Sequence, residues 1–153
     1  ARPSQLALER IRLSELLHNS IDVVRSQAMS KKIVIRIMAD ESLTIHADVG
    51  KLQQVFLNLL QNAVDAMNDG GEIKCIVCRQ GERVMISIAD NGPGIPDEHQ
   101  SKIFNLYYTT KTTGTGLGLS IVHQIVSEHG GELSVTSEQG QGTTFQILIP
   151  CAE

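Results

Sequence analysis

The sequence of 153 residues predicts an α+β domain in which helices cover one face of a mixed β-sheet. Two observations support this fold class. A segment that begins at Asp48 repeats apolar residues at helical spacing for about four turns. Short apolar runs also occur in pairs, as expected for hairpins. Helices and hairpins follow one another in the order α, ββ, α, ββ, α, α, ββ, which is typical of helices packed on a mixed sheet.

The composition fits one globular domain and disfavours several other classes. Hydrophobic residues make up 41% of the chain and charged residues 20%, which separates it from disordered sequences. The formal net charge of -4 disfavours a nucleic-acid-binding surface. No apolar run reaches the ~18 residues that cross a bilayer, and the first ten residues lack the apolar block of a signal peptide.

The three cysteines predict structural thiols. An odd number of cysteines argues against a secreted disulfide framework. Cys75 and Cys78 form a C-x-x-C pair, but they lie in an expected strand. Residues three apart on a strand point to opposite faces, so these two thiols cannot bind one metal together.

The first elements follow from local patterns. Residues 1–12 are interpreted as a connector from an upstream domain, and residues 13–153 as the domain itself. Leu13–Met29 has apolar residues at helical spacing, with Ser14 as the expected N-cap. Two short β runs follow this helix, at Ile33–Met38 and Leu43–Ala47.

The next helix carries the strongest periodic signal in the chain. Asp48 is its expected N-cap, and Asn68-Asp69-Gly70-Gly71 ends it. Its apolar residues follow the i, i+3, i+4, i+7 pattern of a helix that buries one face. They are Leu52, Val55, Phe56, Leu59, Leu60, Ala63, Val64 and Met67.

The second half of the chain predicts two hairpins and two further helices. Glu72–Arg79 and Arg83–Ala89 form a hairpin around Gln80-Gly81. After the glycine- and proline-rich loop Asp90–Pro96 comes a short helix, and a polar segment, Leu106–Thr115, precedes a longer one. The two helices and the closing strands are Asp97–Asn105, Gly116–His129, Glu132–Thr136 and Thr143–Ile149.

Three polar segments have the residue types of a nucleotide site. On the long helix, Asn58, Asn62 and Asp65 fall on one stripe that borders the apolar arc. Amide oxygens are hard, neutral ligands that suit Mg²⁺. Taken alone, this stripe is more simply explained as ordinary helix-surface polarity.

The second segment is Asp90-Asn91-Gly92-Pro93-Gly94, at the end of a strand. Glycines let the backbone approach a planar ligand closely, and the carboxylate can accept from an exocyclic amine such as adenine N6. A surface turn is the alternative, because Asp-Asn-Gly is common in turns.

The third segment is glycine-rich and runs from Lys111 to Ser120 into a helix N-terminus. Free backbone N–H groups and the positive end of the helix dipole make a phosphate site there, with a flexible loop as the alternative. The dinucleotide fingerprint fails because Leu119 takes the place of its last glycine, and no P-loop motif occurs. Together the three segments describe one Mg–ATP site.

On these motifs the sequence resembles the ATP-binding catalytic domain of sensor histidine kinases, within the gyrase, chaperone, kinase and MutL superfamily. The motifs occur in the family's order and cover nearly the whole chain. They are Gln53–Met67, Asp90–Gly94, Ile103–Lys111, Gly114–Ser120 and Gly140–Phe145. The resemblance implies a two-layer α/β sandwich of the Bergerat type, with ATP held between the helices and a mobile lid. The NAVDAM ending and the short YYTTK lid look closest to the nitrogen-regulation subgroup.

The resemblance also implies roles for individual residues. Asn62 is the expected Mg²⁺ ligand, Asp90 the partner of adenine N6 and Thr143 a nearby hydroxyl. Asn58 and Lys111 are the expected catalytic residues. For the two lid tyrosines, Tyr107 and Tyr108, the alternative role is hydrophobic packing within the lid. For Lys111 the alternative is a solvated side chain without a role in the reaction. The other expected nucleotide contacts are Asp65, Ala66, Gly92, Gly94, Ile95, Tyr107, Tyr108, Thr113, Gly114, Thr115, Gly116, Leu117, Gly118 and Leu119.

Two departures from the family bear on the reaction. Asp65 stands where many members carry a basic residue near the phosphates, so Lys111 is the candidate cation. Asn58 stands where the hydrolytic relatives carry a general-base glutamate, and an amide cannot accept a proton at neutral pH. This difference favours a kinase over an ATPase that activates water.

The expected function is transfer of the γ-phosphoryl group of Mg-ATP to a histidine on a neighbouring domain. None of the histidines has the sequence context of a phosphoacceptor, in which an acidic residue follows. They are His18, His46, His99, His123 and His129. The resemblance therefore implies an upstream helical dimerisation and phosphoacceptor domain and a response regulator as partners.

The resemblance further implies a monomeric isolated domain, a homodimeric full-length kinase and a cytoplasmic location, with any membrane anchor elsewhere in the parent protein. Two alternatives remain open. A nucleotide-binding regulatory module without transfer is disfavoured by the intact Asn62, Asp90 and glycine set. A gyrase- or MutL-type ATPase fragment is disfavoured by Asn58.

Overall fold

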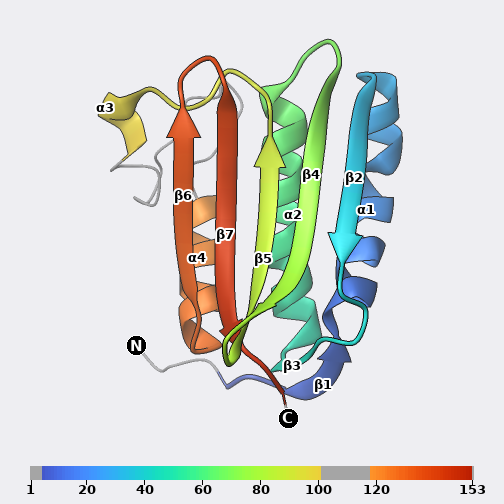
Figure 1. Ribbon diagram of the computed structural model, residues 1–153, viewed down its shortest axis with the longest axis vertical. Helices are drawn as coiled ribbons and strands as arrows, with labels where there is room; N and C mark the ends of the chain where they lie inside the picture. The colour runs from blue at the N-terminus through green and yellow to red at the C-terminus, as the bar shows by residue number, and fades with distance from the viewer. Residues whose placement is uncertain (1–4, 101–117, 153) are drawn as a thin grey trace.

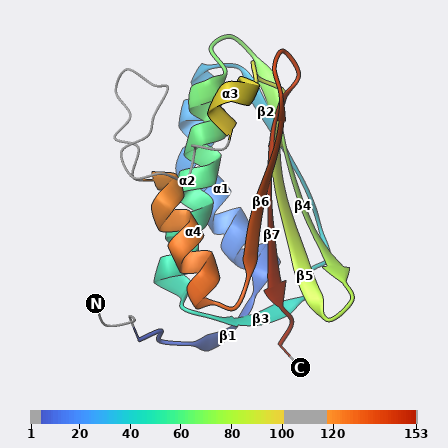
Figure 2. The same ribbon diagram turned by 90° about the vertical axis from the view of Figure 1, so that its left-hand side faces the viewer.

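One layer of the molecule is a five-stranded sheet, and helices α1, α2 and α4 cover one of its faces (Figures 1 and 2). The structure is a computed structural model that describes residues 5–100 and 118–152. The strand order is β2-β4-β5-β7-β6, with β2 and β4 parallel and every other neighbouring pair antiparallel. This arrangement confirms the predicted fold class.

The predicted elements occur in the predicted order with small shifts of their ends, and one further strand is present near the N-terminus. The predicted short helix Asp97–Asn105 is described only to Gln100, and the rest of it lies outside the described residues. The helices are α1 (Leu13–Ser30), α2 (Val49–Ala66), α3 (Asp97–Gln100) and α4 (Gly118–Glu128). The strands are β1 (Glu9–Arg12), β2 (Ile33–Ala39), β3 (Thr44–Ala47), β4 (Gly71–Gln80), β5 (Arg83–Asp90), β6 (Glu132–Glu138) and β7 (Gly142–Pro150).

Helix α2 begins and ends as the sequence predicts. The Asp48 side chain accepts a hydrogen bond from the backbone N–H of Lys51 at 3.1 Å, which satisfies one of the free donors of the first turn. The helix ends at Met67, whose backbone is extended. Every apolar residue that the periodicity assigned to the buried face is buried. Helix α2 therefore forms the centre of the helical layer and contacts both α1 and α4.

Helix α1 corrects one detail of the sequence analysis. Ser14 is not its N-cap, because the helix starts at Leu13 and Arg12 occupies the cap position without a side-chain hydrogen bond. Ser14 is buried in the first turn instead. The spacing fixed the buried face of this helix but left its first residue uncertain by about one position, as is usual for helix ends.

A second, two-stranded sheet lies at one end of the molecule and was not predicted. Strand β1 pairs antiparallel with β3, so Glu9–Arg12 forms part of the folded domain although it falls in the expected connector. The pairing joins segments more than thirty residues apart. Strand β3 was expected from the β run at Leu43–Ala47, whereas Glu9–Arg12 shows no strong local signal. The role of residues 1–12 as a join to an upstream domain stays a prediction.

A polar cluster next to this small sheet connects three distant segments. The Asp48 carboxylate accepts from the backbone N–H of Ala7 at 3.1 Å as well as from Lys51. The backbone N–H of Asp48 donates to His129 Nε2 at 3.1 Å, and His129 Nδ1 lies 2.8 Å from the carbonyl of Ile125. His129 therefore has a structural role and joins the end of α4 to the start of α2.

The cysteines are structural thiols within the described part of the chain, as the sequence predicts. Cys75 is buried on the helix-covered face of β4, Cys78 is half-buried, and neither forms a disulfide. Burial raises the pKa of the Cys75 thiol to about 12, so this thiol stays protonated and inert. No helix within residues 5–100 and 118–152 is long and apolar enough to cross a membrane.

We expect Phe56→Ala to lower the free energy of unfolding by about 3–5 kcal/mol, because the ring is fully buried in α2 and its removal leaves a cavity. Urea denaturation followed by circular dichroism measures the change. Met29→Ala is the control, since that side chain is 69% exposed, and it should shift stability by less than ~0.5 kcal/mol. Equal effects of the two substitutions would contradict this core.

Candidate nucleotide-binding site

Strand register places three polar side chains in one row across the sheet. Asp90 on β5 lies opposite Thr143 on β7, and Thr143 lies opposite Ser137 on β6. Thr143 is buried, and Asp90 and Ser137 are half-buried. These positions have the same strand parity as the buried residues of the core, so the row faces the helical layer.

The next rows along the sheet are apolar. The row directly beside the polar one consists of Ile37, Cys75, Ile88, Phe145 and Val135. The polar row therefore lies at the edge of the hydrophobic core. At such an edge a ligand can be packed on one side by apolar groups and hydrogen-bonded on the other.

Asp90 is the charged member of the row. Burial raises the pKa of its carboxyl group above the ordinary value, and the backbone N–H groups of Gly92 and Thr143 act in the opposite direction. The N–H of Gly92 donates to Asp90 Oδ1 at 2.9 Å, which fixes the start of the following loop. A half-buried carboxylate with remaining acceptor capacity suits a ligand that donates N–H groups.

Glycines allow the loop after Asp90 to pack closely. A Cβ at Gly94, where φ is +77°, would lie 2.3 Å from the carbonyl oxygen of Glu138. A Cβ at Gly142 would overlap the carbonyl oxygen of Asp90 itself. The N–H of Ile95 donates to Ser137 Oγ at 2.7 Å. The loop is thus held against the β6–β7 hairpin, and larger residues at these two glycines would displace Asp90 or the loop.

Asn91 has a structural role that the sequence analysis did not identify. Its side-chain Oδ1 accepts from the backbone N–H of Glu72 at 2.8 Å, and its own N–H donates to the carbonyl of Glu72 at 3.3 Å. These two bonds attach the first residue of the loop to β4. The Asp-Asn-Gly pattern predicts a turn, but it does not indicate that Asn91 binds to β4.

The polar edge of α2 approaches α4 at Asn58. Asn58 Nδ2 donates to the carbonyl of Gln54 at 2.9 Å, which leaves Oδ1 as the free end of the amide. A Cβ built on Gly118 would lie 3.1 Å from that oxygen. The absence of a side chain at Gly118 therefore lets the first residue of α4 lie against Asn58. These two predicted site residues, far apart in sequence, are brought together.

The remaining predicted residues on α2 differ in their surroundings. Asn62 is half-buried one turn after Asn58, and Ala66 is half-buried with its carbonyl oxygen 3.3 Å from a Cβ built on Gly92. Asp65 is exposed and accepts from Gln61 Nε2 at 2.8 Å. Ala66 thus lies against the loop, whereas Asp65 has a partner on the helix surface.

The other predicted contacts divide between the two parts of the chain. Leu119 is half-buried in the first turn of α4 and packs against the core. The predicted lid and most of the glycine segment lie outside the described residues. These are Tyr107, Tyr108, Lys111, Thr113, Gly114, Thr115, Gly116 and Leu117.

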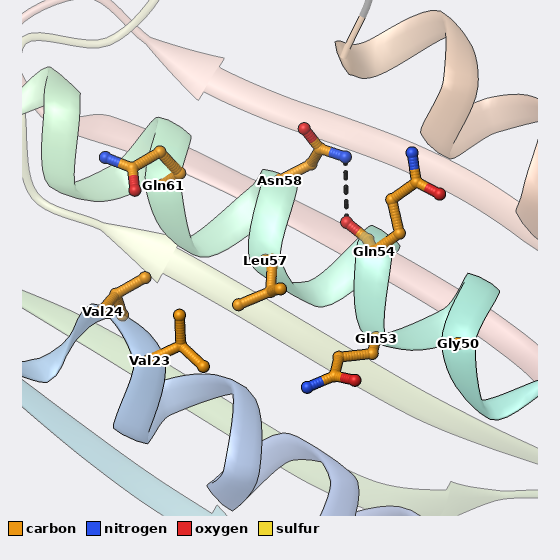
Figure 3. Close-up of a pocket in the computed structure, with 8 residues that line it drawn as sticks. All are labelled: Val23, Val24, Gly50, Gln53, Gln54, Leu57, Asn58 and Gln61. Atoms are coloured by element: carbon orange, nitrogen blue, oxygen red, sulfur yellow. Dashed lines mark hydrogen bonds between the residues drawn. The ribbon is translucent and has the colours of Figure 1, made fainter.

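Figure 3 shows an open groove of about 520 Å³ between α1 and α2. Val23 and Val24 come from α1, and Leu57 and Gln61 from α2. Asn58 lies at one border of the groove, but neither Asp90 nor Thr143 lines it. The groove is therefore distinct from the polar row, and its lining carries no charged side chain.

The described residues include no cluster of three or more histidine, cysteine, aspartate or glutamate side chains suited to a metal. This excludes a protein-built carboxylate or histidine cage within residues 5–100 and 118–152. On α2, half-buried Asn58 and Asn62 carry neutral amide oxygens. Such a donor set fits a cation that is held mainly by phosphates and water, as Mg²⁺ is in nucleotide sites.

The structure is a two-layer sandwich in which a half-buried carboxylate, Asp90, is paired with a buried hydroxyl, Thr143, at one end of the sheet. The family model described as histidine kinase-, DNA gyrase B-, and HSP90-like ATPase matches residues 47–153. The chain belongs to this family.

Individual relatives narrow the comparison to histidine kinases. The chain is 41% identical over 150 residues to sensor histidine kinase ZraS of Escherichia coli K12, covering 97% of this chain and 32% of ZraS. The catalytic domain of histidine kinase ThkA has a TM-score of 0.88 and 34% identity, with 95% and 96% of the two chains covered. The fold and the enzyme class are thus those of a histidine kinase catalytic domain.

Two further solved structures are similar to this chain, one with a bound nucleotide analogue and one with a response regulator. Full-length ShkA in complex with AMPPNP has a TM-score of 0.89 and 32% identity over 99% of this chain and 33% of ShkA. ThkA in complex with the response regulator TrrA has a TM-score of 0.83 and 31% identity over 95% of this chain and 42% of that chain. The present chain therefore spans about a third of the length of ZraS and of ShkA.

We expect Asp90→Asn to stabilise the ligand-free protein at pH 7. The raised pKa means that folded Asp90 binds its proton more tightly than unfolded Asp90 does. The free energy of unfolding therefore falls as pH rises through the range in which Asp90 ionises. Above this range the ionised carboxylate destabilises the folded state, and asparagine removes that destabilisation. Thermal melting between pH 3 and pH 7 should show the gain at pH 7 and its disappearance at low pH.

Asp40→Asn is a control variant that should change stability at pH 7 in the opposite direction. Hydrogen bonds from the Ser42 side chain and backbone lower the pKa of Asp40, so its contribution is present at neutral pH and lost as pH falls. This variant should melt slightly below the wild type at pH 7. A lower melting temperature for Asp90→Asn at pH 7, or a difference that does not change with pH, would contradict the assignment at Asp90.

Proposed function

We propose that this domain binds Mg-ATP and transfers the γ-phosphoryl group to a histidine on a neighbouring domain of a two-component sensor kinase. The observation that carries the proposal is the pairing of half-buried Asp90 with buried Thr143 at one end of the sheet, in a member of an ATPase family. Asn58 and Asn62 on α2 supply a second polar face nearby.

Asp90 and its loop would recognise the base. The carboxylate accepts the amino protons of adenine, and this charge-assisted bond is stronger than a neutral one. Gly92 and Gly94 keep the loop thin enough for a flat ring to lie close to the backbone. Guanine presents an oxygen where adenine presents the amino group, so the same carboxylate would repel it.

Asn62 is the proposed magnesium ligand, with Asn58 beside it. Their amide oxygens suit a hard cation but bring no charge, so phosphate oxygens and water complete its coordination. Bound Mg-ATP supplies the phosphoryl group and the neutralising charge. The protein positions the nucleotide through the amides of α2, the N-terminus of α4 and, as a prediction, Lys111 and the lid.

The polar edge of α2 favours transfer over hydrolysis. A hydrolase needs a base to orient and deprotonate water, and Asn58 has no basic atom at neutral pH. The next carboxylate on this helix, Asp65, is exposed and bonded to Gln61. The acceptor must therefore arrive as a side chain that is already nucleophilic, which a neutral histidine provides.

Partners follow from the relatives rather than from a surface of this chain. ThkA has been crystallised with a response regulator, and both ZraS and ShkA extend well beyond the matching region. We propose an upstream helical phosphoacceptor and dimerisation domain, and a response regulator that receives the phosphoryl group from it. A cytoplasmic location, a monomeric isolated domain and a homodimeric kinase belong to the same proposal.

We expect Asn62→Ala to lose phosphorylation of the acceptor domain while adenine binding persists. The reason is that phosphoryl transfer depends on the position of the metal, whereas the base is held at the other end of the nucleotide. Calorimetric titration with ATP, with and without Mg²⁺, measures how much binding depends on the metal. Gln54→Ala is the matched control on the exposed side of α2. Unchanged Mg²⁺ dependence in Asn62→Ala would refute the ligand role.

Mixing this domain with labelled ATP and a separately produced acceptor-helix domain of the same kinase tests the function directly. Phosphate on histidine, absent when that histidine is replaced by glutamine, would establish the kinase. Release of ADP without labelled protein would favour the gyrase- or MutL-type hydrolase. Binding of ATP with neither outcome would favour a regulatory module. Alone, the domain should turn over far more slowly than the ~10 s⁻¹ typical of enzymes.

A further inference from the structure

The imidazole of His129 joins segments that meet at one end of the molecule. Figure 2 shows β1, the start of α2 and the end of α4 at this end. His129 directly follows the last residue of α4 and is half-buried. The backbone N–H of Asp48 lies 3.1 Å from its Nε2, and the carbonyl oxygen of Ile125 lies 2.8 Å from its Nδ1. The ring is therefore hydrogen-bonded at both nitrogens.

These two bonds determine which nitrogen of His129 carries the proton. A backbone N–H can only donate, so Nε2 must offer its lone pair to Asp48. A neutral imidazole then carries its proton on Nδ1 and donates it to the carbonyl oxygen of Ile125. The arrangement requires the neutral ring, because an imidazolium is a donor at both nitrogens and accepts from neither.

The carboxylate of Asp48 holds two further backbone groups. Its Oδ1 accepts from the N–H of Lys51, and its Oδ2 accepts from the N–H of Ala7, each at 3.1 Å. These bonds hold the pKa of Asp48 below its ordinary value, so the carboxylate is ionised throughout the range in which an imidazole titrates. Asp48 thus caps α2 and also binds the segment that precedes β1.

Protonation of His129 would bring these contacts into competition. The new Nε2–H would face the N–H of Asp48, and two donors cannot bond to each other. The carboxylate of the same residue already interacts with His129 electrostatically and can accept from the imidazolium. Such a charge-assisted bond is stronger than the neutral bonds from Ala7 and Lys51. The carboxylate would therefore move toward the ring and away from Ala7.

The other charged groups at this end of the molecule act in both directions. Lys51 disfavours a positive charge on the ring and Glu128 favours it, but their side chains pair with each other at 3.7 Å. Asp48 is therefore the anion with which a protonated His129 would pair, among the described residues. The small sheet adds exposed groups that solvent screens, namely Glu9, Arg10 and His46.

We infer that Ala7, Asp48 and His129 form a proton-sensitive junction between the segment before β1 and the two helices. Neutral His129 holds the N–H of Asp48 and leaves the carboxylate to Ala7. Protonated His129 takes the carboxylate and releases Ala7. Because an imidazole changes its charge near neutral pH, the junction responds to pH in the physiological range. The segment that is released belongs to residues 1–12, the predicted connector, so pH would change how firmly that connector is attached. The inference does not depend on nucleotide binding.

The test is an NMR titration of the ¹⁵N-labelled protein from about pH 7.5 to about pH 5.5. Spectra of the imidazole nitrogens report the tautomer and the titration of His129, and backbone spectra report the amides of Ala7 and Asp48. His129→Gln keeps one acceptor and one donor but does not titrate. His46→Gln is the matched control, because His46 is an exposed histidine on β3 at the same end of the molecule.

At the upper pH the ring should carry its proton on Nδ1. As the pH falls, the amides of Ala7 and Asp48 should shift with the same midpoint as the ring. At the lower pH the amide proton of Ala7 should exchange with solvent about fivefold faster than in His129→Gln, which is the effect of losing one hydrogen bond. His46→Gln should titrate like the wild type.

Three results would overturn the inference. A ring that stays neutral down to the lower pH would make the junction a fixed structural contact. Titration of the ring without a shift of the Ala7 and Asp48 amides would separate His129 from the connector. Amide shifts that persist in His129→Gln would belong to another titrating group. If His129→Gln does not fold, agreement or disagreement between the ring and amide midpoints in the wild type and in His46→Gln decides the question.

Discussion

The register between β5, β7 and β6 is the constraint on which the candidate site depends. Side chains on a strand alternate between faces, so a slip of one residue would turn Asp90, Thr143 or Ser137 away from the helices. The apolar rows that follow along the same strands prevent such a slip, because it would expose Ile88 and Phe145 together. The hydrophobic core therefore fixes the geometry of the polar row beside it.

This arrangement places the charge of Asp90 where the fold gains little from it. Asp90 is half-buried next to an apolar row, and within the described part of the chain backbone N–H groups of Gly92 and Thr143 compensate its loss of hydration. Gly94 and Gly142 add backbone freedom that the folded state must restrict. Their cost to stability is offset by burial of the apolar face of α2 against the sheet.

Much of the fold could be predicted from sequence because its signals are local. The periodicity of α2, the Asp48 cap and the two hairpins each depend on residues close in the chain. The pairing of β1 with β3 and the role of His129 depend on contacts across tens of residues, which no local pattern records.

The candidate site also combines residues that local motifs predict with residues that only distant contacts reveal. Asp90, its glycines and Thr143 stand out as motifs, and the family resemblance gave them roles. Ser137 belongs to no motif, although counting two residues forward from Val135 and two residues back from Phe145 pairs it with Thr143 once the register is known. The closeness of Asn58 and Gly118 likewise emerges only when α2 and α4 are packed together.

The cluster around His129 also determines how the two helices beside the site can move. The start of α2 and the end of α4 are fastened at Asp48, and both helices then extend away from that point. Asn58 and Gly118 lie about ten residues from the fastening, or ~15 Å along each helix. Because displacement grows with distance from a fixed point, a given change in the angle between α2 and α4 would move Asn58 relative to Gly118 much more than it would move Asp48 relative to His129.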